Sequence, residues 1–231
     1  ALGSAAVAAL GAGVAIADEA PAAEDDALAG KHTWEVKPDP IPADQITETI
    51  DTEILIIGGG YSGTCCAVNA AQNGAKVILV EKDDKLYGNG VGGTGAVGSR
   101  VIDKPLEMER WVATCGNRCR ESLVGKWFRE SERCMNWLLD MAEAHEMGVM
   151  VTVGSRSAIH PEADCYHMLF GGPLFEEHSM ADAVEYMFME EAQAAGAEFV
   201  FEMPAVQLVQ DESGAVTGAI CQNADGEYVQ Y

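Results

Sequence analysis

The chain of 231 residues is long enough for one large domain or two small ones. Hydrophobic residues make up 48% of it, an ordinary share for a globular protein with a buried core. The charge balance is unusual, because 37 Asp and Glu residues against 14 Lys and Arg residues give a net charge of −23. Such an acidic surface argues against nucleic acid or an anionic membrane surface as a partner.

The N-terminal residues 1–17 are nearly all Ala, Gly, Val, Leu and Ile, and they end in Ala15-Ile16-Ala17 before the acidic Asp18. This pattern predicts the apolar region and cleavage site of an export signal. Its mild, Ala/Gly-rich character suits the twin-arginine route, so we expect a periplasmic or extracellular protein without stable membrane insertion. One alternative is a membrane span, although the run is short for the ~20 apolar residues that a span needs. The other alternative is a disordered tail.

A segment rich in Ala, Pro, Asp and Glu follows at residues 18–50, with Pro38, Pro40 and Pro42 alternating. This composition is typical of an extended, flexible tether and not of a core segment. We therefore expect the globular part of the chain to begin near Asp51.

A strand–helix–strand pattern is the most specific feature of the chain. Residues 52–57 predict a strand, and residues 62–73 predict a helix that Gly74 closes. Residues 76–80 predict a second buried strand, which ends at Glu81. One βαβ unit of about 30 residues is the setting in which dinucleotide-binding glycines occur.

Three glycines lie between the first strand and the helix at the G-x-G-x-x-G spacing. Gly58 permits a tight turn, Gly60 lets the backbone approach a pyrophosphate, and Gly63 lets the helix pack closely on the strand. The phosphates would lie at the positive N-terminus of the helix, and Glu81 would accept hydrogen bonds from ribose hydroxyls. The candidate cofactor residues of this unit are Gly58, Gly60, Tyr61, Ser62, Gly63 and Glu81.

In residues 105–231, the sequence predicts helices first and strands closer to the C-terminus. Residues 105–148 predict helices in two or three pieces, separated near Gly116 and Gly125, whereas residues 149–178 show no clear period. Ser179 resembles the N-cap of a further helix. Strands are predicted at residues 198–202, 205–211, 215–222 and 228–231, with tight turns at residues 211–214 and 223–226.

Seven cysteines are present without a C-x-x-C pair. Cys115 and Cys119 are close enough on a predicted helix to share a metal, but no second pair at metal-binding spacing accompanies them. The histidines show no H-E-x-x-H motif either. We therefore expect no metal site and interpret the cysteines as reduced structural thiols.

Several short motifs are spread over residues 51–231: Gly58-Gly59-Gly60-Tyr61-Ser62-Gly63, Glu81-Lys82, Gly88-Asn89, Thr94-Gly95-Ala96, His167 with Gly171-Gly172, and Pro204-Ala205-Val206-Gln207-Leu208-Val209. This combination resembles the FAD-binding flavoprotein family of fumarate reductase and the succinate dehydrogenase flavoprotein subunit, above all its secreted single-chain branch in anaerobic bacteria. The resemblance implies a Rossmann-like α/β FAD-binding domain of glutathione-reductase-like ββα topology, with an inserted helical segment. It also implies that the domain is incomplete at the C-terminus.

The resemblance implies FAD as the cofactor. The glycine-rich loop that contains Asn89 would wrap the isoalloxazine ring, and the backbone of Ala205 would contact the adenine. Family members with covalent flavin have a His at the position of Asn89, so the FAD is expected to be non-covalent. Ala96 and Gly98 depart from the family pattern and leave the detailed contacts of the loop open. The further cofactor candidates are Lys82, Gly88, Asn89, Thr94, Gly95 and Ala205.

The resemblance also implies a reaction, the reduction of an activated C=C bond by hydride from flavin N5. His167 aligns with a His that binds a substrate carboxylate, and a His suits this role because its charge changes near neutral pH. The implied partners are an enoate or dicarboxylate substrate and an external electron donor, cytochrome- or quinol-linked, as in anaerobic respiration.

Family members continue after the last hairpin with a further strand, a glycine pair and a capping domain that carries a proton-donating arginine. We therefore expect the chain to be the N-terminal part of a longer enzyme. Two alternatives stay open at this point. One is an NAD(P)-dependent Rossmann dehydrogenase, because Glu81 fits NAD as well as FAD. The other is a truncated, non-catalytic FAD-binding remnant.

Overall fold

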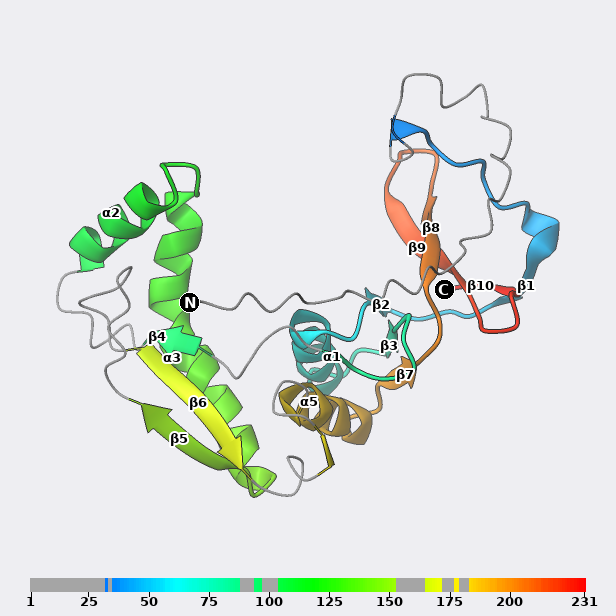
Figure 1. Cartoon of the computed structure of the whole chain (residues 1–231). Helices are drawn as coiled ribbons and strands as arrows, with labels where there is room; N and C mark the ends of the chain where they lie inside the picture. The colour runs from blue at the N-terminus through cyan, green and yellow to red at the C-terminus, as the bar shows by residue number, and fades with distance from the viewer. Residues whose placement is uncertain are drawn as a thin grey trace, which may run out of the picture. The chain divides into compact units, whose positions relative to one another are not determined.

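The computed structural model describes residues 32, 35–87, 94–96, 104–152, 165–171, 177–178 and 183–231 (Figure 1). The chain divides into Ala1–Pro40 and Ile41–Tyr231, and the elements below all belong to the second unit. The predicted export signal and the Ser179 N-cap lie outside the described residues. Within these ranges, no helix combines the length and the apolar character needed to cross a membrane.

A three-stranded parallel sheet in the order β2-β3-β7 forms the centre of the fold. All four residues of β3 are buried, as expected for a strand of a parallel sheet that is covered on both faces. The helix α1 connects β2 to β3, which confirms the predicted strand–helix–strand unit. The bounds are β2 (Ile54–Ile57), α1 (Tyr61–Gln72), β3 (Val77–Val80) and β7 (Glu198–Val200).

The side chains on the two faces of this sheet belong to different hydrophobic clusters. Val77 and Leu79 pack with side chains of α1, of α5 (Ala183–Ala194) and of α3 (Glu121–Ala144). Figure 1 shows α1 and α5 side by side. Ile78 and Val80 pack instead with residues of the second sheet described below. The alternation along β3 thus gives the layered α/β arrangement that the sequence predicted.

Two helices, α2 (Lys104–Thr114) and α3, form the predicted helical segment. They are separated at Gly116 and Asn117, which both have positive φ angles, +62° and +59°. The predicted break at Gly125 is wrong, because Gly125 is buried inside the continuous helix α3. An added Cβ would lie 3.5 Å from the side chain of Met108 in α2, an ordinary van der Waals distance, so Gly125 faces α2 and does not interrupt α3.

A small antiparallel sheet in the order β4-β6-β5 was not predicted from the sequence. Its two longer strands are nearly continuous apolar runs, and periodicity cannot distinguish such runs from buried helix segments. Figure 1 shows β5 and β6 side by side, with β4 beyond β6. The bounds are β4 (Thr94–Ala96), β5 (Gly148–Thr152) and β6 (Cys165–Gly171).

The C-terminal strands form a four-stranded sheet in the order β1-β10-β9-β8, which confirms the predicted hairpins. In the first turn the Asp211 carboxylate accepts hydrogen bonds from the N–H groups of Ser213 and Ala215, at 2.8 and 3.0 Å. Asn223 caps the second turn in the same way. The bounds are β1 (Ile46–Thr49), β8 (Ala205–Gln210), β9 (Val216–Gln222) and β10 (Tyr228–Gln230).

The strand β1 corrects the predicted tether. It pairs in parallel with β10, and the next residue, Ile50, donates its N–H to Gln230 O at 2.8 Å. Ile41 donates its N–H to the Gln207 side chain at 2.8 Å. The folded body therefore begins near Ile41 and not at Asp51.

Candidate cofactor site

The glycine turn lies between the end of β2 and the start of α1. Gly58 has a φ angle of +100° and donates its N–H to Val80 O at 2.8 Å, which ties the turn to β3. A Cβ on Gly63 would lie 2.0 Å from Gly58 O, so only glycine allows α1 to start this close to the strand. The backbone of the turn thus has the geometry that the G-x-G-x-x-G spacing predicts.

The N-terminus of α1 is open to an anion. Gly60 is the N-cap and supplies no side chain, and the first turn of the helix contains no acidic residue. The first N–H groups of any α-helix lack intrahelical acceptors and carry a partial positive charge. Tyr61, Ser62 and Gly63 therefore present main-chain donors suited to a phosphate.

The Tyr61 ring belongs to the core. It packs edge-to-face on Phe188 with the ring centroids 5.5 Å apart, and Phe188 stacks on Trp137 at 5.6 Å. Burial raises the pKa of the Tyr61 phenol well above its usual range, with smaller contributions from the Cys65 thiol and the Glu185 carboxylate. At this turn Tyr61 therefore offers a ligand its main-chain N–H and not its side chain.

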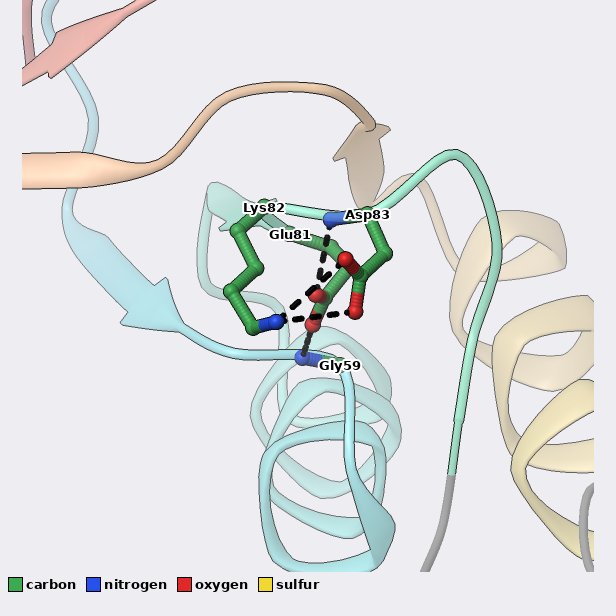
Figure 2. A network of polar contacts seen from close by, with 4 residues as sticks. All are labelled: Gly59, Glu81, Lys82 and Asp83. Atoms are coloured by element: carbon green, nitrogen blue, oxygen red, sulfur yellow. Dashed lines mark hydrogen bonds and ion pairs between the residues drawn. The ribbon is translucent and has the colours of Figure 1, made fainter. Parts of the chain in front are cut away.

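The Glu81 side chain connects the end of β3 to the glycine turn that follows β2. Its side chain is 7% exposed, and its Oε2 atom accepts a hydrogen bond from Gly59 N at 2.5 Å. Its Oε1 atom accepts a hydrogen bond from Asp83 N at 3.0 Å, as Figure 2 shows. A carboxylate has about four acceptor positions, so lone pairs remain for ribose hydroxyls.

The segment that follows Glu81 is fixed against the end of β7. Glu81 donates its N–H to Val200 O at 2.8 Å and accepts at its own main-chain oxygen from Met203 N at 2.8 Å. Glu202 donates its N–H to Asp83 O at 3.0 Å and has a φ angle of +52°. Non-glycine residues with a positive φ angle have a strained backbone, and such residues cluster at functional sites. Sequence analysis missed Asp83 and Glu202, because no motif at these two positions signals the hydrogen bond between their main chains.

Lys82 lies at the rim of the site. Its side chain is 70% exposed and pairs with the Asp83 carboxylate at 3.1 Å (Figure 2). An exposed pair of this kind contributes at most about 1 kcal/mol to stability. Lys82 is therefore free to change partner when a ligand binds.

Other predicted site residues lie elsewhere in the fold. Ala205 starts β8 and packs on the cluster that contains Val80 and Cys221. Thr94 and His167 are register partners in β4 and β6, and Gly95 is the partner of Tyr166. The structure thus brings one cofactor candidate and the substrate candidate together. Gly88 and Asn89 lie outside the described residues.

A cleft of about 260 Å³ runs along β2 beside β8 and β9. None of the glycine-turn residues line it, so we do not assign it to the cofactor. Among the described side chains, no cluster suited to a metal ion occurs, and the six cysteines other than Cys165 are free. Lining residues of the cleft include Leu55, Ile57, Leu208, Val216 and Tyr231.

Residues 53–231 match the family described as FAD binding domain. The chain belongs to this family, which confirms the resemblance to fumarate reductase and succinate dehydrogenase flavoproteins. The cofactor is FAD, and the alternative of an NAD(P) dehydrogenase is thereby closed. The open helix N-terminus and the Glu81 carboxylate fit the phosphates and a ribose of this group.

Curated relatives support this assignment. Digoxin reductase of Eggerthella lenta is 29% identical over 46% of this chain and 21% of its own length. Vinyl phenol reductase of Lactiplantibacillus plantarum is 26% identical over 74% of this chain and 34% of its own length. Fumarate reductase (cytochrome) of Shewanella frigidimarina is 23% identical over 75% of this chain and 30% of its own length. The chain thus spans about a third or less of these relatives.

Solved structures share the fold. A flavocytochrome c3 fumarate reductase in an open conformation matches with a TM-score of 0.62 and 20% identity, over 87% of this chain and 36% of that chain. The quinol fumarate reductase of E. coli matches with a TM-score of 0.62 and 17% identity, over 80% of this chain and 31% of that chain. These likenesses confirm the predicted α/β FAD-binding fold.

Proposed function

We propose that the protein is a flavoprotein reductase that reduces an activated C=C bond of an enoate or dicarboxylate. The observation that carries the proposal is the complete glycine turn with the buried Glu81 carboxylate, in a chain of the FAD-binding family. The relatives named digoxin reductase, vinyl phenol reductase and fumarate reductase support reduction as the reaction.

Four parts of the chain have roles in the proposed reaction. When bound, FAD supplies a hydride from its N5 atom to one carbon of the C=C bond. The main-chain donors at the start of α1 hold the pyrophosphate, Glu81 accepts from ribose hydroxyls, and the backbone of Ala205 supports the adenine. His167 donates a hydrogen bond to a substrate carboxylate and so orients the C=C bond.

Three further properties belong to the proposal. The FAD is bound non-covalently, because Asn89 cannot form the bond that a His forms to flavin. An external donor, cytochrome- or quinol-linked, supplies the electrons. The protein is exported by the twin-arginine route, and residues 1–17 are removed on export. The motivation for export is the cleavage pattern Ala15-Ile16-Ala17.

Two measurements test the proposal. First, the purified yellow protein is precipitated with acid, and the flavin should remain in the supernatant; colour in the pellet would contradict non-covalent binding. Second, the FAD-loaded protein is assayed with reduced viologen and a panel of enoates, including fumarate. Oxidation of viologen that depends on an enoate is expected, and a protein that holds FAD but reduces none of them would contradict the proposed reaction.

A further inference from the structure

Two cysteines flank the corner at which the chain turns from α2 into α3. Cys115 follows the last residue of α2, and Cys119 precedes the Arg120 N-cap of α3, so the prediction that the pair shares one helix is wrong. Figure 1 shows the reversal of the chain between the two helices. Gly116 and Asn117 make this reversal with their positive φ angles. The corner therefore brings the two thiols to one place in the fold.

Main-chain hydrogen bonds fix the backbone of this corner. Asn117 donates its N–H to Val112 O at 2.8 Å, which closes the C-terminal turn of α2. Arg118 donates its N–H to Cys115 O at 3.2 Å. The relative position of the two cysteines is thus set by hydrogen-bonded backbone on the α2 side of the corner and by the start of α3 on the other.

The two thiols differ in their surroundings. Cys119 is half-buried, whereas Cys115 is exposed. Cys119 packs against a hydrophobic cluster between the two helices, in which the rings of Trp111 and Trp127 have centroids 4.6 Å apart. The corner thus holds one thiol that solvent reaches beside one that packing keeps in place. The other members of the cluster are Met108, Val124 and Phe128.

The two thiols also interact directly, because Cys119 forms a side-chain hydrogen bond with Cys115. Burial raises the pKa of the Cys119 thiol, and the hydrogen bond with Cys115 raises it further, so Cys119 keeps its proton as the donor. Hydrogen-bonded sulfur atoms are close enough for side-chain rotation to reach disulfide geometry, in which the Cβ atoms lie about 3.8 Å apart. Among the described residues, no group of three metal-binding side chains includes this pair, which favours disulfide chemistry over a metal site.

We propose that Cys115 and Cys119 are a redox site that exchanges with disulfides and closes into an intramolecular disulfide across the corner between α2 and α3. The exposed Cys115 thiolate attacks one sulfur of a small disulfide such as oxidised glutathione, whose S–S bond breaks and releases one thiolate. Cys119 then loses its proton to solvent and attacks the Cys115 sulfur of the mixed disulfide, which releases the second thiolate. Two protein thiols thereby lose two electrons and two protons, and the oxidant becomes two thiols. The inference does not depend on the proposed reaction.

The test incubates the FAD-loaded protein with oxidised glutathione in the absence of oxygen. Free thiols are then blocked by alkylation, and the protein is digested with trypsin. Trypsin cuts after Arg118, between the two cysteines, so the proposed disulfide links two peptides that mass spectrometry identifies. The digest also shows which cysteines are alkylated and which carry glutathione.

The variants are Cys115→Ser and Cys119→Ser, because serine keeps the size of the side chain and removes the sulfur chemistry. Cys134→Ser is the control, since Cys134 is exposed on α3 outside the corner. Circular dichroism checks that each variant folds. The wild-type peptide map decides the question by itself if a serine variant does not fold.

In the wild type and in Cys134→Ser, the peptides of Cys115 and Cys119 should be found linked, with the loss of two hydrogen atoms. Cys119→Ser should keep glutathione on Cys115, because no second thiol resolves the mixed disulfide. Cys115→Ser should react with glutathione more slowly than Cys119→Ser, since its remaining corner thiol is half-buried. In glutathione mixtures, the linked fraction of wild type should fall with the square of the concentration of reduced glutathione, as expected for one internal bond.

Three outcomes would overturn the inference. In the first, wild type keeps glutathione on Cys115 as stably as Cys119→Ser does. In the second, Cys115 is linked to a cysteine other than Cys119. In the third, both corner thiols of the wild type are still alkylated after incubation with an excess of oxidised glutathione. A protein that forms the disulfide but reduces no enoate would refute the proposed reaction and leave the redox site standing.

Discussion

The Glu81 carboxylate accepts a hydrogen bond from Gly59 N at 2.5 Å, so the residue that ends β3 holds the turn that ends β2. This contact gives Glu81 a role in the protein itself, in addition to the ribose role predicted from its position. Both residues are buried, so the Gly59 N–H has no access to water that could replace the carboxylate. Glu81 therefore pre-organises the turn that receives the phosphates.

Replacement of Glu81 by alanine is expected to have two separable effects. The buried Gly59 N–H loses its acceptor, which should lower the free energy of unfolding of the apoprotein by about 1–3 kcal/mol. Loss of the ribose contact should weaken FAD binding by about 1.5–3 kcal/mol. Urea unfolding of the apoprotein measures the first effect, and quenching of flavin fluorescence on binding measures the second.

Glu53→Ala is the matched control for Glu81→Ala. Glu53 also accepts a main-chain hydrogen bond, from Lys76 N at 2.7 Å, but it is exposed and remote from the turn. Water can replace its carboxylate, so FAD binding should not change. A dissociation constant for FAD that is the same in Glu81→Ala and in wild type would remove Glu81 from the ribose site.

The second prediction concerns Gly63→Ala. The added Cβ would lie 2.0 Å from the main-chain oxygen of Gly58, and a backbone atom cannot move away as a flexible side chain can. Helix α1 must shift from the strand, at a cost of about 1–3 kcal/mol, and the turn loses its shape for FAD. Thermal unfolding and FAD titration both measure this effect.

Gly125→Ala is the control for this substitution. Gly125 lies inside α3, and its added Cβ would meet only the mobile end of Arg129 at 3.2 Å and Met108 at 3.5 Å. Alanine is a better helix former than glycine by about 1 kcal/mol. Gly125→Ala should therefore leave stability unchanged or raise it. Equal losses in both variants would show that the close approach at Gly63 is unimportant.

The glycine turn could be predicted from the sequence because its requirements are local. A positive φ at Gly58 and a close approach at Gly63 each demand glycine at one position, so the spacing alone carries the geometry. The hairpin turn at Asp211 is local in the same sense, since its side chain bonds the next residues.

The features that sequence analysis missed depend on distant parts of the chain. Strand β1 is polar at most positions and is defined by its pairing with β10, which lies at the other end of the chain. Thr94, His167 and Thr152 come into register only through the pairing of three strands. Gly125 seemed a helix break because glycine is a poor helix former, but contact between α2 and α3 decides its environment.

The third prediction concerns His145, which follows α3 and contacts two carboxylates of α5. Its Nε2 atom lies 2.8 Å from Glu191 Oε1, and its Nδ1 atom lies 3.3 Å from Glu190 Oε2. The His145 side chain is only 17% exposed. A double-mutant cycle of His145→Ala and Glu191→Ala should give a coupling energy of about 0.5–1 kcal/mol.

The exposed pair of Arg133 and Glu130 on α3 is the control for this cycle. Their side chains are 77% and 42% exposed, so water and salt screen the interaction. Urea unfolding of all single and double variants gives both coupling energies. The prediction that His145 couples α3 to α5 would be refuted if the His145 cycle gave no more coupling energy than the control cycle.

The last prediction concerns Cys221, which is fully buried in β9 between the four-stranded sheet and the parallel sheet. Burial raises the pKa of its thiol from 9.0 to about 11. Between these pH values the folded protein keeps a proton that the unfolded chain has lost. The stability that the buried thiol contributes is therefore complete below pH 9 and is lost as the pH rises toward 11.

Urea unfolding at several pH values from 8 to 11 should show this loss, with a slope from one thiol of at most about 1.4 kcal/mol per pH unit. Burial also raises the pKa of the Tyr231 phenol, with smaller contributions from Cys221, Glu198 and Glu48, so part of the slope belongs to that group. Cys221→Ala should reduce the slope, whereas Cys66→Ala, at an exposed position, should leave it unchanged. Labelling with a disulfide reagent at pH 8 should modify Cys66 in the folded protein and Cys221 only after unfolding. Rapid labelling of Cys221 in the folded protein, or an unchanged alkaline slope in Cys221→Ala, would show that the thiol is not protected by the packing of the two sheets.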